Sequence, residues 1–212
     1  MNILVVKGNN RPEGVSTKMY ETFLEALNDA KDLTVNTFEL FEEDMPYLNQ
    51  DLYSAFEKLE KDVELTDAEQ SILAARQKVM DAVTAADVLV FAYPLWNLTI
   101  PAKLQTFIDY IYVPGYAFKY DEQGNSIPLL TDKKVILLNA RGGDYSTPEM
   151  MPLEMAVNYM HNALGGTFGM QIIDEVIIEG HAAMPDKAEQ LIQEGLNKVT
   201  RIATEFAYET VK

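Results

Sequence analysis

Three short stretches of the chain combine glycine, hydroxyl, amide and aromatic residues in patterns that suit ligand binding. The first runs from Gly8 to Lys18, the second from Tyr93 to Pro101, and the third from Asn139 to Tyr145. Each follows a short apolar run that predicts a buried strand. Because parallel strands end at one edge of a sheet, and ligands bind outside that edge, we expect the three stretches to form one site.

The first stretch predicts a site for a phosphate group at the start of a helix. Exposed N–H groups at a helix N-terminus bind anions. Ser16 is a suitable N-cap residue, Thr17 adds a hydroxyl group and Lys18 adds a positive charge. Gly8 and Gly14 are too far apart for the dinucleotide-binding fingerprint, and the Walker pattern is absent. An ordinary capped helix after a loop is the alternative interpretation.

The second stretch favours a flat heteroaromatic ligand. It carries the only tryptophan of the chain, Trp96, beside Asn97 and Leu98 and between two prolines. Trp96 and Leu98 offer apolar faces, and the amide of Asn97 can both donate and accept hydrogen bonds. The alternative is a proline-bounded loop whose tryptophan packs into the core.

The third stretch contains two successive glycines, Gly142 and Gly143, directly after a predicted strand. Glycine allows a ligand to approach the backbone closely. The two amides could donate to a carbonyl group or to a developing anion. A tight turn without a ligand explains the same residues.

Composition and charge exclude several classes of protein. The 212 residues include 17 Lys and Arg against 33 Asp and Glu, a net charge of −16, and no cysteine. An acidic chain repels nucleic-acid backbones and anionic membrane surfaces, so we expect neither as a partner. The lack of cysteine excludes disulfides, thiol catalysis and cysteine-bound metals. The apolar run near the N-terminus is too short for a signal peptide, which predicts a cytoplasmic protein.

Few other residues suggest chemistry. His161 and His181 are the only histidines, and we expect both to be structural or exposed to solvent. The acidic run 42–44 is interpreted as a solvated surface rather than a metal site, and no metal is predicted. No G-x-S-x-G motif of a hydrolase is present.

The elements that must position these stretches alternate between strands and helices. This order predicts an α/β fold, a doubly wound five-stranded parallel sheet in a single domain over residues 1–212. A hairpin is expected beside 121–125, and the segment from Glu42 to Leu65 is long enough to be a lid or an oligomer contact. Predicted strands are Ile3–Val6, Leu33–Leu40, Val88–Ala92, Lys134–Leu138 and Gln171–Ile178, and predicted helices start at Ser16, Thr66 (with a capping box), Pro101, Pro152 and Pro185.

Together, the three stretches resemble the FMN-dependent NADH:quinone oxidoreductase/azoreductase family, which has a flavodoxin-like fold. The resemblance covers essentially the whole chain. Its most specific part is the run Pro94–Pro101, followed by the glycine pair after Arg141 and by Gly14-Val15-Ser16. Leu95, Trp96 and Leu98 depart from the Met, Tyr and Phe that are commoner in the family, and Ala140 replaces a frequent serine.

The resemblance implies a homodimer that binds FMN at each edge of the subunit interface. The partner subunit would complete the acceptor pocket through the segment 42–53 and the hairpin, with Phe118, Tyr120 and Tyr145 as pocket residues. The implied cofactor-binding residues are Asn9, Ser16, Thr17 and Lys18 around the phosphate, Leu95, Trp96, Asn97 and Leu98 beside the ring, and Ala140, Arg141, Gly142 and Gly143 at its pyrimidine edge.

The implied activity is two-electron transfer from NADH to quinones and azo compounds by a ping-pong mechanism. The flavin N5 would carry the hydride, so no catalytic side chain is required. The protein would position the flavin and supply the electrostatic field around it. Basic side chains including Arg11, Lys18 and Arg141 would form a rim for the phosphates of NADH. The runner-up is a flavodoxin-like electron carrier without NADH oxidation of its own, and a third reading is a hydrolase or binding module without flavin.

Overall fold

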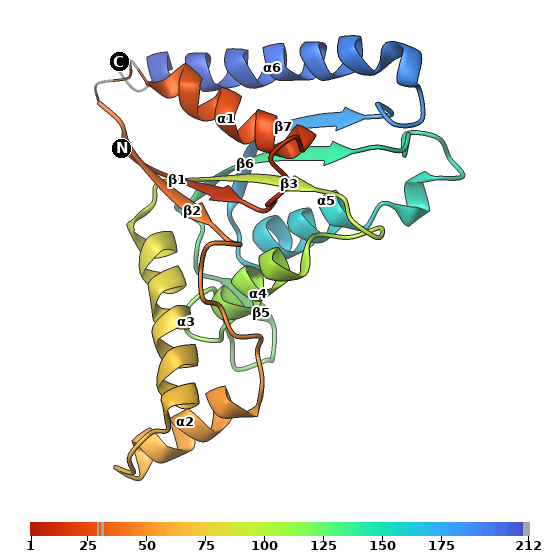
Figure 1. Cartoon of the computed structure of the whole chain (residues 1–212). Helices are drawn as coiled ribbons and strands as arrows, with labels where there is room; N and C mark the ends of the chain where they lie inside the picture. The colour runs from red at the N-terminus through yellow and green to blue at the C-terminus, as the bar shows by residue number, and fades with distance from the viewer. Residues whose placement is uncertain (29, 31, 210–212) are drawn as a thin grey trace.

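A parallel sheet of five strands forms the centre of the molecule (Figure 1). The computed structural model describes residues 1–28, 30 and 32–209. The strands lie in the order β2-β1-β3-β6-β7, which confirms the predicted doubly wound sheet. They are β1 (Asn2–Lys7), β2 (Thr34–Glu39), β3 (Val88–Pro94), β6 (Lys134–Arg141) and β7 (Gln171–Glu179).

Helices cover both faces of this sheet and create two hydrophobic cores (Figure 1). Helices α1 (Val15–Leu27) and α6 (Ala188–Glu209) cover one face, and α3 (Asp67–Ala85), α4 (Ala102–Ile111) and α5 (Ala156–Met160) cover the other. Strand β3 is buried along its whole length, which explains its continuous apolar sequence. Within the described part of the chain, no helix is both long and apolar enough to span a membrane.

The predicted capping box at the start of α3 is confirmed. The Thr66 side chain accepts a hydrogen bond from the amide of Glu69 at 3.3 Å, and the Glu69 carboxylate accepts one from the amide of Thr66 at 2.7 Å. The same carboxylate accepts a hydrogen bond from Lys58 Nζ at 2.7 Å. This pair ties α3 to the helix before it, α2 (Gln50–Glu60).

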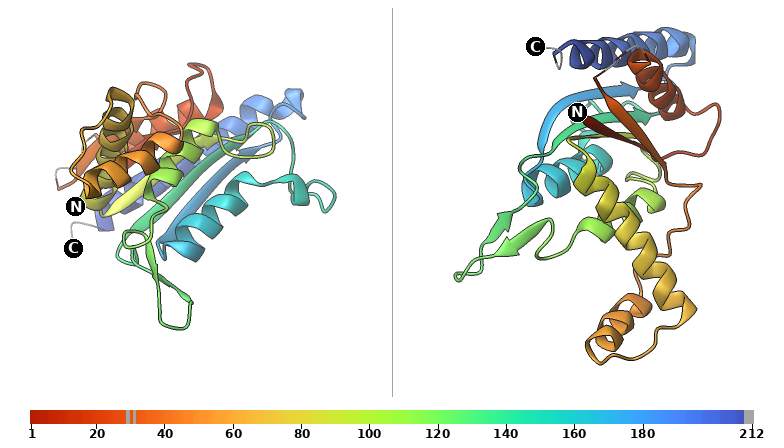
Figure 2. Two further views of the ribbon diagram at one scale, coloured as in Figure 1. Left: turned by 90° about the horizontal axis from the view of Figure 1, so that it is seen from below. Right: turned by 90° about the vertical axis from the view of Figure 1, so that its left-hand side faces the viewer.

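Helix α2 lies within the segment from Glu42 to Leu65, for which the sequence analysis predicted no helix. Asn49 caps it by accepting a hydrogen bond from the amide of Asp51 at 2.9 Å. Only Leu52 and Ala55 of this helix are buried, whereas Tyr53, Phe56 and Leu59 are exposed. Helix α2 and the adjoining end of α3 project away from the sheet (Figures 1 and 2).

The single helix predicted from Pro152 to Leu164 is wrong in detail. The chain forms a 3₁₀ turn at Met151–Leu153, then α5, and then a π-helix at His161–Thr167. The cause of the break is Glu154, whose carboxylate accepts hydrogen bonds from the amides of Ala156 and Val157, both at 2.9 Å. A side chain that bonds to these first-turn amides marks the start of a new helix.

The predicted hairpin is confirmed as β4 (Phe118–Tyr120) and β5 (Ser126–Pro128), which pair in antiparallel fashion. Its turn includes Gly124 with φ of 85°, a conformation that glycine adopts without strain. The hairpin projects from the body of the molecule (Figure 2). Helix α6 begins three residues later than predicted, after a 3₁₀ turn at Pro185–Lys187.

Candidate functional site

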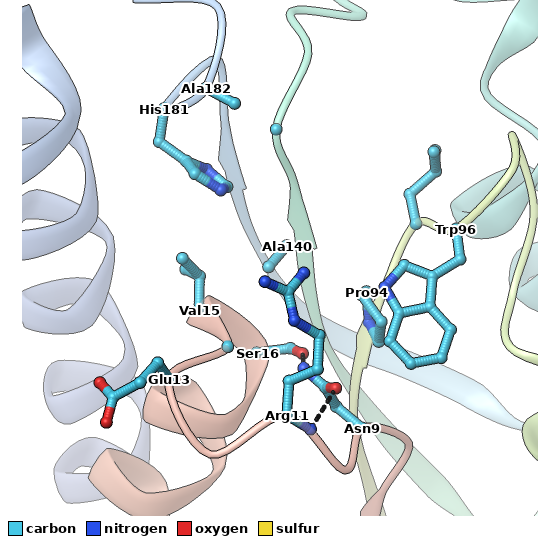
Figure 3. Close-up of a pocket in the computed structure, with 13 residues that line it drawn as sticks. Asn9, Arg11, Glu13, Val15, Ser16, Pro94, Trp96, Ala140, His181 and Ala182 are labelled. Atoms are coloured by element: carbon cyan, nitrogen blue, oxygen red, sulfur yellow. Dashed lines mark hydrogen bonds between the residues drawn. The ribbon is translucent and has the colours of Figure 1, made fainter. Parts of the chain in front are cut away.

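A cavity of about 410 Å³ lies at the carboxyl edge of the sheet (Figure 3). Strands β2 and β3 lie on opposite sides of β1, so the strand order changes direction there. Such a switch point is where open α/β sheets bind ligands, and the volume is typical of small-molecule sites. The lining residues come from the ends of four strands: Asn9, Arg11, Glu13, Gly14, Val15, Ser16, Pro94, Leu95, Trp96, Ala140, Gly142, His181 and Ala182.

The N-terminus of α1 opens into this cavity. Gly14 is its N-cap residue, so the prediction that Ser16 is the N-cap is wrong: the helix begins one residue before Ser16. No side chain caps the helix, and its first turn contains no acidic residue. Among the described residues, the amides of Val15 and Ser16 have no acceptor. Free first-turn amides and the helix dipole favour the binding of an anion at such a helix end.

Buried polar side chains fix the loop before α1. Asn9 Nδ2 donates a hydrogen bond to Ser16 Oγ at 2.9 Å, and Asn9 Oδ1 accepts one from the amide of Arg11 at 3.0 Å. The Thr17 hydroxyl donates to the carbonyl of Arg11 at 2.8 Å. Asn9, Ser16 and Thr17 are each at most 3% exposed. Asn9 and Thr17 therefore hold the loop in the shape that presents the helix amides.

Gly14 is required by the same packing. A Cβ atom at this position would lie 2.3 Å from Asn9 Nδ2 and 3.0 Å from the carbonyl oxygen of Arg11. Neither group can move freely, because the Asn9 side chain is buried and hydrogen-bonded on both sides. Only glycine fits without displacing the loop.

The end of β3 supplies an apolar wall. Figure 3 shows the indole of Trp96 beside Pro94, facing the cavity. The indole also packs edge-on against Phe41, with ring centroids 6.1 Å apart. A flat aromatic wall of this kind suits a planar ligand.

Asn97 and Leu98 form a tight turn directly after this wall. The amide of Trp96 donates to the carbonyl of Thr99 at 2.9 Å, and the reverse bond measures 3.1 Å. Asn97 and Leu98 have φ of 50° and 73°, the pattern of a type I′ turn. Positive φ is uncommon for a bulky residue such as Leu98 and stores strain. Asn97 is exposed at the tip of the turn, and neither residue lines the cavity.

The end of β6 supplies backbone donors. Ala140 and Gly142 line the cavity, and in the described part of the chain the amides of Gly142 and Gly143 have no acceptor. The carbonyl of Gly142 accepts a hydrogen bond from the amide of Ala182 at 3.0 Å. A Cβ atom at Gly142 would lie 2.9 Å from that of Ala182, so glycine permits this close approach.

Arg141 lies between these residues but does not line the cavity. Successive side chains of a strand point to opposite faces, so Ala140 and Arg141 point in opposite directions. Arg141 Nε donates to Glu179 Oε2 at 3.0 Å, and its Nη1 lies 3.5 Å from Glu154 Oε1. The guanidinium also lies over the ring of Tyr145. The structure thus places Arg141 in a buried ion-pair cluster between β6, β7 and α5.

The other proposed site residues fall into two groups. Thr17, Lys18 and Gly143 lie near the cavity but outside its lining, and Tyr145 packs beside Gly143. Phe118 and Tyr120 belong to the hairpin and do not line the cavity of their own chain. The Phe118 ring packs edge-on against Tyr112 and Tyr120, with ring centroids 5.3 and 5.5 Å apart.

Sequence reasoning missed the contribution of the loop after β7. His181 and Ala182 line the cavity, and Figure 3 shows the imidazole directed toward it. Burial lowers the pKa of His181 below its usual value. The available signal was Gly180, two residues after the predicted strand Gln171–Ile178, because a further parallel strand must end at the same edge.

Comparison with known proteins agrees with this geometry. A family model described as a flavodoxin-like fold matches residues 1–202. The chain is 42% identical over 207 residues to FMN-dependent NADH:quinone oxidoreductase 3 of Bacillus cereus, covering 96% of this chain and 99% of that protein. It is also 42% identical to FMN-dependent NADH:quinone oxidoreductase 1 of Bacillus subtilis, with the same coverage.

Solved structures give the same result. An azoreductase from Bacillus anthracis has a TM-score of 0.87 and 42% identity, covering 96% of this chain and 99% of that one. An FMN-dependent NADH-azoreductase of the same species, solved in complex with FMN, has a TM-score of 0.87 and 25% identity, with 97% and 99% coverage. The chain therefore belongs to the FMN-dependent NADH:quinone oxidoreductase family, whose members have a flavodoxin-like fold.

Proposed function

We propose that this protein binds FMN in the cavity at the sheet edge and uses NADH to reduce quinones and azo compounds. The observation that carries the proposal is the meeting of the β1, β3 and β6 ends around one cavity, with an uncapped helix N-terminus at its side. The names of its relatives, FMN-dependent NADH:quinone oxidoreductase and azoreductase, agree with this chemistry.

The residues present fit the phosphate end of FMN. A phosphate dianion needs several donors, and the free amides of Val15 and Ser16 supply two of them in a helix turn without an acidic residue. The Ser16 hydroxyl adds a further group, positioned by Asn9 at 2.9 Å. We propose that Thr17 holds the loop through the carbonyl of Arg11 and that Lys18 contributes only its charge.

The residues present also fit the ring of FMN. Pro94, Leu95 and Trp96 provide an apolar wall, and the free amides of Gly142 and Gly143 are suited to its hydrogen-bonding edge. We keep Asn97 and Leu98 as proposed ring contacts, because their strained turn directly follows the wall and a ligand is a reason to retain such strain. Ala140 would approach the ring through its backbone, and Arg141 would act through the ion pairs that hold this strand end.

When bound, FMN supplies the redox chemistry, accepting two electrons from NADH and delivering them to a quinone or azo acceptor. The protein binds the cofactor and orients it, and the wall formed by Trp96 and Pro94 excludes water from one side. No side-chain nucleophile or metal is needed. We propose that NADH and the acceptor occupy the same space in turn, which is a ping-pong mechanism and predicts parallel double-reciprocal plots.

We further propose that the protein is a homodimer. Exposed apolar side chains cluster on and around α2, where Tyr53 is 55% and Leu59 is 54% exposed, and a large exposed apolar surface marks an interaction site. The partner's segment 42–53 and hairpin, with Phe118 and Tyr120, would then complete the acceptor pocket together with Tyr145. A cytoplasmic location is part of the same proposal, because NADH is supplied there.

NADH oxidation by the purified protein with FMN and menadione tests the function. The proposal predicts turnover that depends on both FMN and the quinone, and bleaching of an azo dye under the same conditions. The alternative of a flavodoxin-like electron carrier predicts almost no NADH oxidation unless a separate reductase is added. That result would refute the proposed activity while leaving FMN binding in place.

A further inference from the structure

His181 is a titratable side chain at the cavity that the proposed function leaves unused. It comes from the loop after β7, and its ring is directed toward the space beside Val15 and Ala140 (Figure 3). Its Nδ1 atom is buried and has no hydrogen-bond partner among the described residues. The other histidine, His161, differs in being paired with Glu175 at 2.8 Å. The described residues therefore leave one hydrogen-bonding atom of His181 unused.

Without a ligand, burial favours the neutral form of His181. Burial lowers its pKa from the ordinary value of 6.5, because the charged ring loses hydration. A protonated imidazole donates from both nitrogens, so the unpartnered Nδ1 atom makes the charged form costlier still. An acceptor oxygen brought to the ring would remove that cost.

The charges around His181 do not already provide such an acceptor. Arg11 and Glu13 line the same cavity with opposite signs, and the ion pairs found among the described residues include none between Glu13 and His181. The Asp144 carboxylate is bonded to Ser146 at 2.6 Å, and that bond lowers the pKa of Asp144. The titratable and charged groups on the surrounding elements are Arg11 and Glu13 before α1, Asp144 and Tyr145 after β6, Glu179 at the end of β7, and Asp186 and Lys187 before α6.

We propose that His181 is a cofactor-binding residue that takes up a proton when the phosphate group of FMN binds beside it. The inference rests on the proposed FMN site, whose phosphate end at Val15 and Ser16 lies on the side of the cavity that His181 faces (Figure 3). A nearby anion favours the charged form of an imidazole. Filling the cavity thus couples the binding of a phosphate to the binding of a proton.

The coupling has a definite sign. If FMN raises the pKa of His181, the complex binds more protons than the free protein, and affinity rises as pH falls. The gain begins below the pKa of the complex and is complete below the pKa of the free protein, which lies under 6.5. For one proton the limit is about a tenfold change in the dissociation constant per pH unit.

The dissociation constant of FMN, measured by flavin fluorescence from about pH 7 to about pH 8.5, tests the proposal. In this range the phosphate of FMN is a dianion throughout, because its second pKa is about 6. Wild-type protein should bind FMN more tightly at each lower pH, and His181→Gln should bind it with a flat profile. Arg11→Gln, which removes a permanent charge from the same cavity, should bind FMN more weakly at every pH but keep the wild-type slope.

Riboflavin and calorimetry complete the test. Riboflavin lacks the phosphate group and should bind the wild type without pH dependence. Calorimetry of FMN binding in two buffers of different ionisation enthalpy should detect net proton uptake by the wild type, a readout that needs no variant.

Tight FMN binding by the wild type without proton uptake would overturn the inference alone. Retention of the slope by His181→Gln, or an equal slope with riboflavin, would overturn it as well. Failure of the wild type to bind FMN at any pH would instead overturn the proposed function.

Discussion

Asn9 links the two functional ends of the β1–α1 loop. Its side chain donates to Ser16 and accepts from Arg11, and it is 3% exposed. A buried hydrogen-bonded side chain of this kind fixes a single loop conformation, because losing either partner leaves a polar group unsatisfied. The proposed anion site at the start of α1 therefore depends on Asn9, although Asn9 lies outside the helix.

Gly14→Ala should weaken FMN binding by about tenfold or more, equivalent to about 1.4 kcal/mol. The new methyl group would lie 2.3 Å from Asn9 Nδ2 and would break its bond to Ser16. Flavin fluorescence titration measures the effect. Gly166→Ala is the matched control, since the nearest atom to its Cβ lies 3.9 Å away. Equal affinity of the two variants would contradict this account of the loop.

Ser16→Ala should weaken the binding of FMN by about tenfold. The variant loses the hydroxyl group, and Asn9 Nδ2 loses the oxygen that accepts its hydrogen bond. Riboflavin, which has no phosphate, should bind the variant and the wild type equally well. Parallel titrations with the two flavins measure the difference, and Thr200→Ala, which removes an exposed hydroxyl group of α6, serves as the control. A similar loss for both flavins would place Ser16 beside the ring rather than the phosphate.

For single residues, the sequence predicted which side chains lie at the cavity better than it predicted the role of each one. Ser16, Trp96 and Gly142 line one cavity because three strand ends had to meet. Arg141 was predicted beside the ring, but successive side chains of a strand point to opposite faces, so its side chain points away from Ala140 and pairs with Glu179. His181 was missed because a lone histidine after a strand gives no motif, and only its place at the sheet edge reveals it.

At the scale of elements, the buried ion pairs of Arg141 connect three parts of the fold. It joins β6 to Glu179 of β7 and to Glu154, which caps α5. The side chains of Arg141 and Glu154 are only 8% and 7% exposed. Breaking a buried pair leaves an uncompensated charge, and this costs far more than losing a pair at the surface.

Arg141→Met should lower the free energy of unfolding by about 3 kcal/mol, because Glu154 and Glu179 lose their buried cation. Urea denaturation followed by circular dichroism measures this. Lys7→Met, which removes a pair with the more exposed Glu39, should cost less than about 1 kcal/mol. Equal losses in the two variants would show that burial does not control the strength of these pairs.

The start of α3 was predicted from the sequence, whereas helix α2 and the π-helix were not. The start of α3 was found because its capping box is encoded in four residues around Thr66. Helix α2 was missed although Leu52, Phe56 and Leu59 recur at helical spacing, and only Leu52 and Ala55 of it are buried. The π-helix at His161–Thr167 has no local pattern in the sequence, and the hydrogen bond between His161 and Glu175 joins it to β7.

For the molecule as a whole, the alternation of strands and helices was sufficient to predict the parallel sheet, but not how α2 and the hairpin project from it. Buried strands of a parallel sheet need helices on both faces, which fixes the two cores. The projecting α2 and the hairpin bury little within their own chain (Figure 2). Their exposed apolar residues form the surface that we propose another subunit covers.

The wild-type protein should therefore have twice its chain mass of 23.9 kDa in solution. Size-exclusion chromatography with light scattering measures this. Introducing charges with Tyr53→Glu and Leu59→Glu should shift the protein toward a monomer, while Gln193→Glu on exposed α6 should not. A wild-type monomer, or an unchanged dimer in the double variant, would contradict the proposed interface.

The visible absorption spectrum of the FMN-reconstituted protein, recorded anaerobically before and after addition of NADH, tests the central claim most directly. The account predicts a flavin spectrum that remains with the protein through gel filtration, bleaches with NADH and returns when a quinone is added. A protein that retains no flavin, or whose bound flavin stays oxidised in the presence of NADH, would contradict it.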